Sequence, residues 1–255
     1  MSADGKVVVV TGGSGGIGEA VALHLSRDGY RVAVVAVSSV GTAEKVAALI
    51  RAEGGDANGF ACDLRDAQAC KNLIDNVLET FGKIDALVNA AGVCKPTPAG
   101  SAELHDTDKM IDINLRGTWN MINSVVPILK ATGAGKIVNI AAIAGVTCFG
   151  TYAIYCATKA AIVMMTRALA CELARENINV NCVAPGDMAS DTNEEVRNEP
   201  GMQGLRDFMA VCTPRNSTFS EPKDVAVAIS FLASDSARAM HGSCLLMDEG
   251  MSAGL

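Results

Sequence analysis

The sequence is poor in positive charge and in the residue patterns that build metal sites. Its three histidines are dispersed and its nine cysteines include no C-x-x-C pair, so we predict neither a metal site nor a disulfide framework. Lysine and arginine number 21 against 28 aspartates and glutamates, which gives a net charge of -7. Because nucleic-acid binding needs clustered Lys and Arg, this balance argues against a nucleic-acid partner.

Long apolar runs and an export signal are also missing. The apolar run 160–170 is interrupted by Arg167 and is shorter than the roughly 20 residues that cross a bilayer. Residues 1–5 lack the basic region, apolar region and small-residue cleavage site of a signal peptide. We interpret the scattered cysteines as buried thiols in a reducing compartment. We therefore expect no membrane partner and a cytoplasmic location.

What the sequence does contain is a regular alternation of apolar strand-like runs and helical segments. With 255 residues, 49% of them hydrophobic, and no linker, the chain predicts a single domain over 1–255. Its unbroken Val, Ile and Leu strands predict an α/β fold, a doubly wound parallel sheet of about seven strands with helices on both faces. The expected strands are Lys6–Thr11, Arg31–Val37, Ala57–Ala61, Ile84–Asn89, Lys136–Ala141, Asn179–Val183 and Ser243–Met247. The expected helices are Gly15–Asp28, Gly41–Glu53, Asp66–Phe81, Leu104–Ala131 (two helices run together), Tyr152–Glu176 and Glu221–Ala233.

The segment 186–220 interrupts this alternation. It is polar, contains Pro200, Gly201 and Pro214, and has one short apolar patch near 205–211. Connections of this length inside a compact domain are usually functional or mobile. We interpret the segment as a lid over the substrate, and the alternative is a disordered surface insertion.

A glycine-rich loop joins the first expected strand to the first expected helix. The segment 10–18 reads Val-Thr-Gly-Gly-Ser-Gly-Gly-Ile-Gly, and a loop in this position is typical of a dinucleotide-binding Rossmann fold. Gly12 permits the sharp turn, Gly16 lets the backbone approach the pyrophosphate, and Gly18 allows the helix to pack closely on the strand. The helix N–H groups then face the anion.

Further motifs at the expected spacings extend over the whole chain. The spacing Thr-Gly-x-x-x-Gly-x-Gly is accompanied by Cys62-Asp-Leu, Asn89-Ala-Ala-Gly92, Asp112-Ile-Asn-Leu, Tyr155-Cys-Ala-Thr-Lys159 and Pro185-Gly186. In this set the chain resembles the classical short-chain dehydrogenase/reductase family. The resemblance implies a nicotinamide-dependent oxidoreductase acting on a small-molecule secondary alcohol or carbonyl substrate.

The resemblance also implies which residues contact the cofactor. Asp63 would hydrogen-bond the adenine, and the segment after Pro185-Gly186 would contact the nicotinamide amide, with Ser190 where a threonine often stands. The cofactor contacts implied are Gly12, Gly16, Ile17, Gly18, Asp63, Leu64, Asn89, Ala90, Gly92, Tyr155, Lys159, Pro185, Gly186, Met188 and Ser190. A homotetramer is implied as well, because in the family the C-terminal stretch, here 242–255, packs across a subunit interface.

The choice between NAD and NADP depends on the end of the second strand. An NAD enzyme normally carries an acid there, which binds the ribose 2′-hydroxyl, but the segment 36–39 reads Ala-Val-Ser-Ser. It also lacks an arginine, and Gly15 occupies a position where NADP-dependent relatives often carry a base. Since Ser38 and Ser39, helped by Ser14 or Lys45, could bind a 2′-phosphate, we favour NADP over NAD.

Tyr155 and Lys159 lie four residues apart in an expected helix, on the same face. A cation within about 4 to 6 Å of a phenol favours the phenolate, and Lys159 and an oxidised nicotinamide would both supply positive charge beside Tyr155. In the family the tyrosine is the general acid/base, the lysine also holds the nicotinamide ribose, and the position of Asn114 supports a proton-relay water. Tyr152 is the rival tyrosine, but the residue four positions on is Cys156.

One position departs from the family pattern. The family places a serine that hydrogen-bonds the substrate oxygen thirteen residues before the tyrosine, and Ala142 stands there. We consider three interpretations: an engineered Ser-to-Ala substitution, a natural variant with another donor such as Thr147 or Thr151, and a weak or inactive homologue. Losing one such donor typically costs about 10² to 10³ in turnover.

The function expected from these residues is hydride transfer between NADP or NAD and a secondary alcohol or ketone. The alternative is a nucleotide-binding redox sensor without turnover, which could tolerate Ala142. The sequence does not identify the substrate. Polar residues of the expected lid, such as Asp187, Arg197 and Arg215, indicate a polar one, whereas Cys148 and Phe149 would suit an apolar one.

Overall fold

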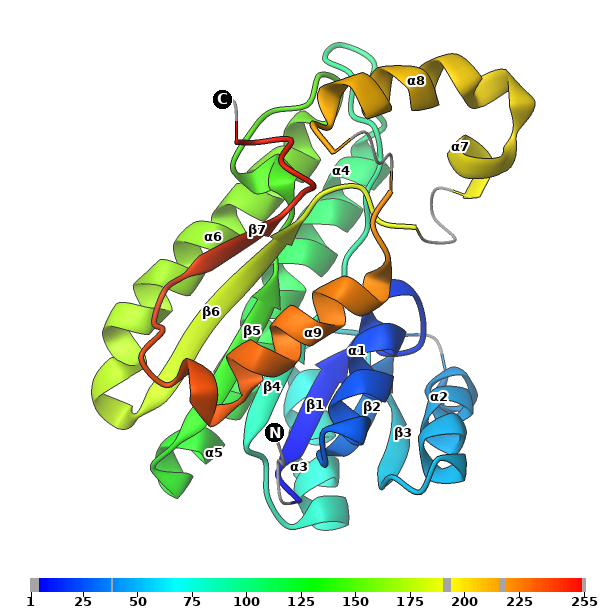
Figure 1. Cartoon of the computed structure of the whole chain (residues 1–255). Helices are drawn as coiled ribbons and strands as arrows, with labels where there is room; N and C mark the ends of the chain where they lie inside the picture. Colours follow the sequence, from blue (N-terminus) through cyan, green and yellow to red (C-terminus); the bar gives the residue numbers. More distant parts are fainter. Residues whose placement is uncertain (1–4, 38, 190–193, 216–218, 254–255) are drawn as a thin grey trace.

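The chain folds around one parallel sheet (Figure 1). The structure is a computed structural model and describes residues 5–37, 39–189, 194–215 and 219–253. Its strands are β1 (Val7–Thr11), β2 (Arg31–Ala36), β3 (Ala57–Ala61), β4 (Ala86–Asn89), β5 (Gly135–Ile140), β6 (Ile178–Pro185) and β7 (Cys244–Met247). Every strand pair is parallel and the order is β3-β2-β1-β4-β5-β6-β7. The predicted doubly wound parallel sheet is confirmed, with boundaries that shift by one or two residues.

Helices cover both faces of the sheet. The α-helices are α1 (Gly16–Arg27), α2 (Val40–Ala52), α3 (Ala67–Phe81), α4 (Leu104–Met110), α5 (Thr118–Thr132), α6 (Ala153–Leu173), α7 (Glu194–Asn198), α8 (Gln203–Cys212) and α9 (Pro222–Ala233). Shorter turns are the π-helix η1 (Ile111–Gly117) and the 3₁₀ turns η2 (Ile143–Gly145), η3 (Ala174–Glu176), η5 (Pro200–Met202) and η6 (Asp235–Ala237). The two helices expected over 104–131 are present, joined by the π-helix η1.

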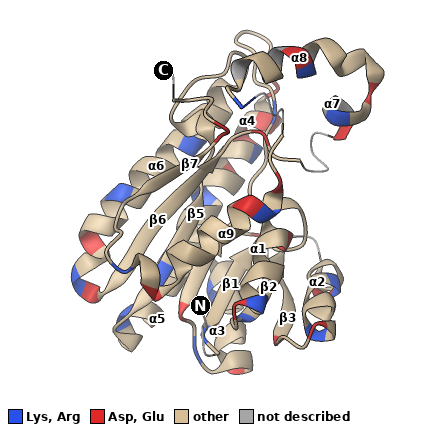
Figure 2. Ribbon diagram, viewed as in Figure 1, with Lys and Arg blue, Asp and Glu red and all other residues tan. Residues whose placement is uncertain are grey.

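Alternate residues of each buried strand feed two apolar cores, one on each face. In β1, Val8 and Val10 pack with α1, α2 and α9, whereas Val7 and Val9 pack with α3, α5 and α6. Side chains of successive strand residues point to opposite faces, so a run such as Val7–Val10 serves both cores. Residues of both charge signs are interspersed along the helices and loops in the view of Figure 2.

Local signals set where the helices begin and end. The Asp66 carboxylate accepts hydrogen bonds from the backbone N–H groups of Gln68 and Ala69 and so caps the start of α3. The same helix ends at Gly82, whose φ of +78° lies in the left-handed region that glycine enters without strain. Ser39 caps α2 by accepting a bond from the Thr42 backbone N–H.

The predicted lid segment is more regular than its sequence suggested. No helix was expected in 186–220, and this was wrong, because α7, η5 and α8 lie within it (Figure 1). Pro200, Gly201 and Pro214 divide the segment into pieces too short to show a helical period. At its base Met188 and Ser220 form an isolated parallel bridge, and the Ala189 N–H donates to the Ser220 carbonyl at 2.9 Å. The two ends of the segment are therefore held together.

Helix α6 and the following turn, 153–176, form the one segment in the described ranges that is long and apolar enough to cross a membrane. By length and composition, the expectation that the apolar run in this region is too short was wrong. Within the fold, residues such as Ile162, Leu169 and Leu173 are buried in the cores of the sheet. The protein therefore covers part of the apolar surface of α6, whereas Met164 on the same helix is exposed.

Candidate active site

Loops that follow β1, β4, β5 and β6 meet at one edge of the sheet. Because all these strands are parallel, their carboxyl ends lie at the same edge. In open α/β sheets ligands bind outside the carboxyl ends of the strands, at the point where the strand order reverses. Here that point lies between β1 and β4, which pair through Thr11 and Asn89.

The glycine loop after β1 is shaped by close backbone contacts. Gly12 has a φ of +64°, and a Cβ there would lie 2.8 Å from the Ala91 backbone. A Cβ on Gly18 would overlap the Gly12 carbonyl oxygen. Gly16 has a φ of +53° but faces open space. The loop therefore needs glycine for its turn at Gly12 and for helix packing at Gly18, while the open side of Gly16 leaves room for a ligand.

Two further features fit a dinucleotide at this edge. Helix α1 begins after Gly15 without a side-chain cap, so its first N–H groups remain available to an anion. Ser14 is half-buried in the same loop. The Asn89 side chain donates to Asn139 at 2.9 Å, but its buried Oδ1 has no partner among the described atoms and can accept a bond from a ligand hydroxyl. The residues present thus fit a nicotinamide dinucleotide.

The residues expected at the adenine end are engaged locally. Arg65 donates to both oxygens of the Asp63 carboxylate, which lowers the pKa of that carboxyl. Leu64 is buried against Gly117. Ser39 caps α2 and its hydroxyl lies 2.9 Å from that of Thr42. Ser38 and Ser190 lie outside the described residues.

Asn114, Lys159, Tyr155 and Gly92 come together next to the glycine loop. A Cβ on Gly92 would lie 3.4 Å from both Asn114 Oδ1 and Lys159 Nζ. The Asn114 amide is held by Val93, accepting from its N–H and donating to its carbonyl at 2.8 Å each. Lys159 Nζ donates to the Ile140 carbonyl at 2.9 Å and lies 5.8 Å from the centre of the Tyr155 ring. The spacing of four residues does place Tyr155 and Lys159 together.

Burial dominates the electrostatics of this cluster. Burial raises the pKa of the Tyr155 hydroxyl above its usual range, and Cys94 and Asp187 add to the rise. Burial also lowers the pKa of Lys159 to about 8. Without the cofactor the Tyr155 pKa is thus raised, because desolvation of the phenolate is the largest effect. That Lys159 and an oxidised nicotinamide together favour the phenolate stays a prediction.

Sequence reasoning missed two supports of this cluster. The Asn114 amide also donates to the hydroxyl of Thr158 at 3.2 Å, and the Ile140 carbonyl receives the lysine. Thr158 directly precedes Lys159 on α6, and its hydroxyl lies within hydrogen-bond distance of the Asn114 amide. The available signal for this support was Thr158 itself, a polar residue at a helix position that is buried in the fold.

Ala142 lies at the carboxyl end of β5, directly before the turn η2. Its backbone is extended and its carbonyl accepts from the Gly145 N–H at 2.8 Å, while its side chain is buried. The two alternative hydroxyl donors lie farther along this loop. Thr147 is half-buried, and Thr151 has a φ of +65° and is exposed.

The loop after β6 runs along the same edge. Pro185 ends the strand, and the Gly186 N–H donates to the Met247 carbonyl at 3.0 Å. A Cβ on Gly186 would lie 3.0 Å from the Asp248 backbone, so glycine lets the two segments pack closely. Met188 is buried and Asp187 is partly buried. Ile17 and Ala90 border the core next to the glycine loop.

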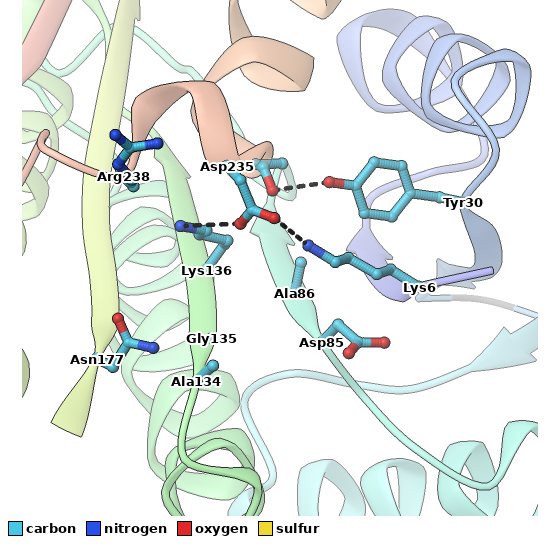
Figure 3. Close-up of a pocket in the computed structure, with 11 residues that line it drawn as sticks. Lys6, Tyr30, Asp85, Ala86, Ala134, Gly135, Lys136, Asn177, Asp235 and Arg238 are labelled. Carbon is cyan, nitrogen blue, oxygen red and sulfur yellow. Dashed lines mark hydrogen bonds and ion pairs between the residues drawn. The ribbon is translucent and has the colours of Figure 1, made fainter. Parts of the chain in front are cut away.

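A separate cavity of about 260 Å³ lies at the opposite edge of the sheet (Figure 3). Figure 3 shows Asp235 between Lys6 and Lys136, at 2.8 and 3.7 Å from their amines. The Tyr30 hydroxyl donates to the Ala233 carbonyl beside them. These contacts tie the chain near its start to η6, so we interpret this region as a structural junction. Within the described residues no group of three or more His, Cys, Asp or Glu side chains could hold a metal ion.

The fold and the edge just described define a Rossmann-fold protein with a dinucleotide site beside a tyrosine-lysine-asparagine cluster. The chain matches, over residues 12–252, the family model described as enoyl-(acyl carrier protein) reductase. It is 35% identical to D-threitol dehydrogenase of Mycolicibacterium smegmatis over 97% of this chain and 93% of that protein. It is also 35% identical to a 3-oxoacyl-(acyl-carrier-protein) reductase of Staphylococcus aureus, over 96% of this chain and 98% of that one.

A solved structure agrees with these matches. The gluconate 5-dehydrogenase of Burkholderia cenocepacia, in complex with NADP and tartrate, superposes with a TM-score of 0.94 at 28% identity, covering 100% of this chain and 98% of that one. The chain therefore belongs to the classical short-chain dehydrogenase/reductase family. It is an oxidoreductase that uses NADP or NAD on an alcohol or carbonyl group, and the alternative of a redox sensor without turnover is not favoured.

Proposed function

We propose that this protein interconverts a small secondary alcohol and its ketone with NADP, and that Tyr155 transfers the proton. The observation that carries the proposal is the packing of Gly92, Asn114 and Lys159 against one another beside Tyr155, at the edge where the glycine loop opens. Within the described part of the chain the Tyr155 hydroxyl makes no hydrogen bond, so it is available to a substrate oxygen.

In this proposal each residue of the cluster has a separate role. The raised Tyr155 pKa keeps its hydroxyl protonated at neutral pH, which suits a proton donor to a carbonyl oxygen. In alcohol oxidation the same oxygen must first lose its proton, and the positive charge of Lys159 and of an oxidised nicotinamide favours that loss. Asn114 is fixed by Val93 and Thr158 and would support a proton-relay water. The cofactor supplies or accepts the hydride.

We propose NADP as the preferred cofactor, because no carboxylate follows β2 within the segment 36–39. Ser39 and Ser14 offer hydroxyls to a 2′-phosphate. Lys45, six residues after Ser39 on α2, is exposed. The test is thermal unfolding with NADP or NAD, followed by an assay of nicotinamide reduction over a panel of alcohols. A cofactor at 100 times its dissociation constant should stabilise the fold by about 2.7 kcal/mol. No shift with either cofactor at millimolar concentration would overturn the proposed function.

Further parts of the proposal concern the whole chain. We propose that 1–255 forms one catalytic domain, with 186–220 as a lid over the substrate. The closed base of this segment at Met188 and Ser220 supports a unit that moves as one piece. We also propose a homotetramer in the cytoplasm. The eight cysteines whose side chains are described are free thiols, which is typical of a reducing compartment. Only Cys62, Cys70 and Cys182 of them are buried, so the expectation of mostly buried thiols was wrong.

A further inference from the structure

Asp187 follows β6, the strand that lies next to β5 and therefore next to the strand that ends before Ala142. Strands β5 and β6 pair with Ile140 opposite Val183, and the Ala141 N–H donates to the Val183 carbonyl at 2.8 Å. Two residues beyond this pairing the chain reaches Ala142 on one strand, and four residues beyond it reaches Asp187 on the other. Both therefore leave the sheet at the same edge, on neighbouring strands.

The backbone around Asp187 is held in place from two sides. Gly186 packs on Asp248, and the Asp187 carbonyl accepts from the Ser220 N–H at 2.9 Å. Because the backbone is fixed before and after it, the position of the carboxylate depends on the fold and not on a free loop.

The Asp187 carboxylate has no hydrogen-bond or ion-pair partner in the described ranges. It is partly buried, and burial raises the pKa of this carboxyl. The negative charge of Asp187 contributes to the raised pKa of the Tyr152 and Tyr155 hydroxyls and of the Cys94 thiol. Arg215, a candidate cation from the lid, is instead bound to Glu249 at 2.7 Å.

A desolvated carboxylate without a partner is costly unless a ligand supplies hydrogen-bond donors. The hydroxyl groups of a polyol are such donors, and a carboxylate can accept two of them at once. A negatively charged substrate would instead be repelled at this position, since no cation within the described residues forms an ion pair with Asp187.

We propose that Asp187 is a specificity-determining residue that binds a hydroxyl group of an uncharged polyol substrate, next to the carbon that reacts at Tyr155. This inference rests on the proposed function and deepens it by naming the substrate class. It distinguishes between the activities of two relatives, D-threitol dehydrogenase and gluconate 5-dehydrogenase, because threitol is an uncharged polyol whereas gluconate carries a carboxylate.

The test compares three alcohols with the NADP-saturated protein: D-threitol, D-gluconate and cyclohexanol. The variants are Asp187→Asn, which removes the charge at constant size, and the matched control Asp75→Asn, an exposed carboxylate on α3. Hydrogen bonds to charged groups contribute about 1.5 to 3 kcal/mol, so Asp187→Asn should lower kcat/KM for threitol about 10- to 100-fold, mainly through KM. Cyclohexanol should change less than about twofold, and gluconate should improve.

Binding is measured alongside turnover, because Ala142 slows the chemistry in the proposed mechanism. Threitol should raise the melting temperature of the NADP-saturated wild-type protein and of Asp75→Asn, and should lose this effect in Asp187→Asn. The inference is overturned if cyclohexanol is oxidised but Asp187→Asn leaves threitol unaffected, or if an amino alcohol is preferred to threitol. It is also overturned if the variant weakens NADP binding and not alcohol binding. Failure of the proposed function looks different, since then no cofactor binds and no alcohol reacts.

Discussion

At position 142 the side chain is a buried methyl group where the family has a hydroxyl donor to the substrate oxygen. We predict that Ala142→Ser raises turnover by roughly 10² to 10³, with a smaller effect on cofactor affinity. The physical reason is that a fixed donor stabilises charge developing on the substrate oxygen, while the glycine loop lies at another part of the site. Steady-state kinetics and cofactor titration measure the two effects separately.

The control for this prediction is Tyr155→Phe made in the Ala142→Ser protein. Because the tyrosine and the serine act on one oxygen atom, losing the tyrosine should abolish the gain. If Ala142→Ser leaves the rate unchanged while Tyr155→Phe still destroys it, another donor is at work, and Thr147 is the first to mutate. Equal activity in all three proteins would refute the proposed mechanism.

Lys159 gives a pH-dependent contribution to stability with a defined sign. Its pKa falls from the ordinary 10.5 to about 8 because the amine is buried. Between these values the unfolded chain holds a proton that the folded chain has lost, so the contribution of Lys159 to stability rises with pH from about 8 to 10.5. Below pH 8 both forms are charged and the cost of burying the charge is constant. We predict that Lys159→Met removes this rise, which is on the order of 3 kcal/mol.

The measurement is denaturant unfolding of wild type and Lys159→Met at several pH values from 7 to about 10. The difference in free energy of unfolding between the two proteins reports Lys159 together with Cys94, the thiol whose pKa Lys159 lowers, while groups remote from Lys159 cancel. A constant difference, as expected from the lost bond to Ile140 alone, would contradict the prediction.

At this scale the sequence identified residue types and spacings but not their surroundings. Tyr155, Lys159 and Asn114 could be selected because each stands in a motif with fixed spacing, and they do lie together. The direction of the Tyr155 pKa could not be predicted, since it depends on how much water the fold removes from the hydroxyl. The sequence identified Asp187 only as a polar residue of the lid. That its carboxylate has no ion-pair partner among the described residues can be seen only in the folded structure.

Among the secondary-structure elements, the junction of β1 and α1 has the tightest backbone contact at the site. We predict that Gly18→Ala destabilises the fold by about 1 to 3 kcal/mol or more and abolishes cofactor binding, because the new methyl group would overlap the Gly12 carbonyl oxygen. Gly15→Ala is the matched control, since its Cβ would meet nothing within 4 Å and its backbone is extended. Chemical denaturation and cofactor-induced thermal shift check both variants. Equal behaviour of the two would show that the contact is easily relieved.

The elements themselves were predictable where the hydrophobic period was long and uninterrupted. Buried strands such as β1 and the amphipathic helix α3 were found within one or two residues of their ends. The π-helix η1 carries Asn114 in the middle of a longer helical run, and its extra residue per turn leaves no mark on the apolar pattern. Helix α8 was missed because proline and glycine bound it closely on both sides.

From the large apolar side chains that are exposed in the described residues, we select two groups as candidate subunit interfaces. One comprises Ile111, Trp119 and Met164, on η1, α5 and α6. The other comprises Val227 on α9 and Leu246 on β7, the strand whose outer edge has no partner in the sheet. Two self-complementary surfaces on one subunit generate a tetramer built as a dimer of dimers.

We therefore predict that the wild-type chain forms a tetramer and that Trp119→Glu and Leu246→Glu each reduce it to a dimer, because a charge on either surface opposes burial. The double variant should be monomeric. Light scattering measures the mass, and a value of one 26.3 kDa chain for wild type at micromolar concentration would contradict the prediction. Glu172→Gln, a change at an exposed carboxylate on α6, serves as a control.

The contact between α9 and α1 has a consequence for co-translational folding. The apolar side of α1, with Val21 and Leu25, shares a core with Ile229 and Leu232 of α9, and Tyr30 bonds to the Ala233 carbonyl. Translation makes residues 16–27 long before residues 222–233, so a nascent chain carries an uncovered α1 until α9 has been made. Its partly made sheet is then a substrate for chaperones and for aggregation. A chain truncated before residue 222 therefore lacks α9 and leaves the apolar side of α1 uncovered.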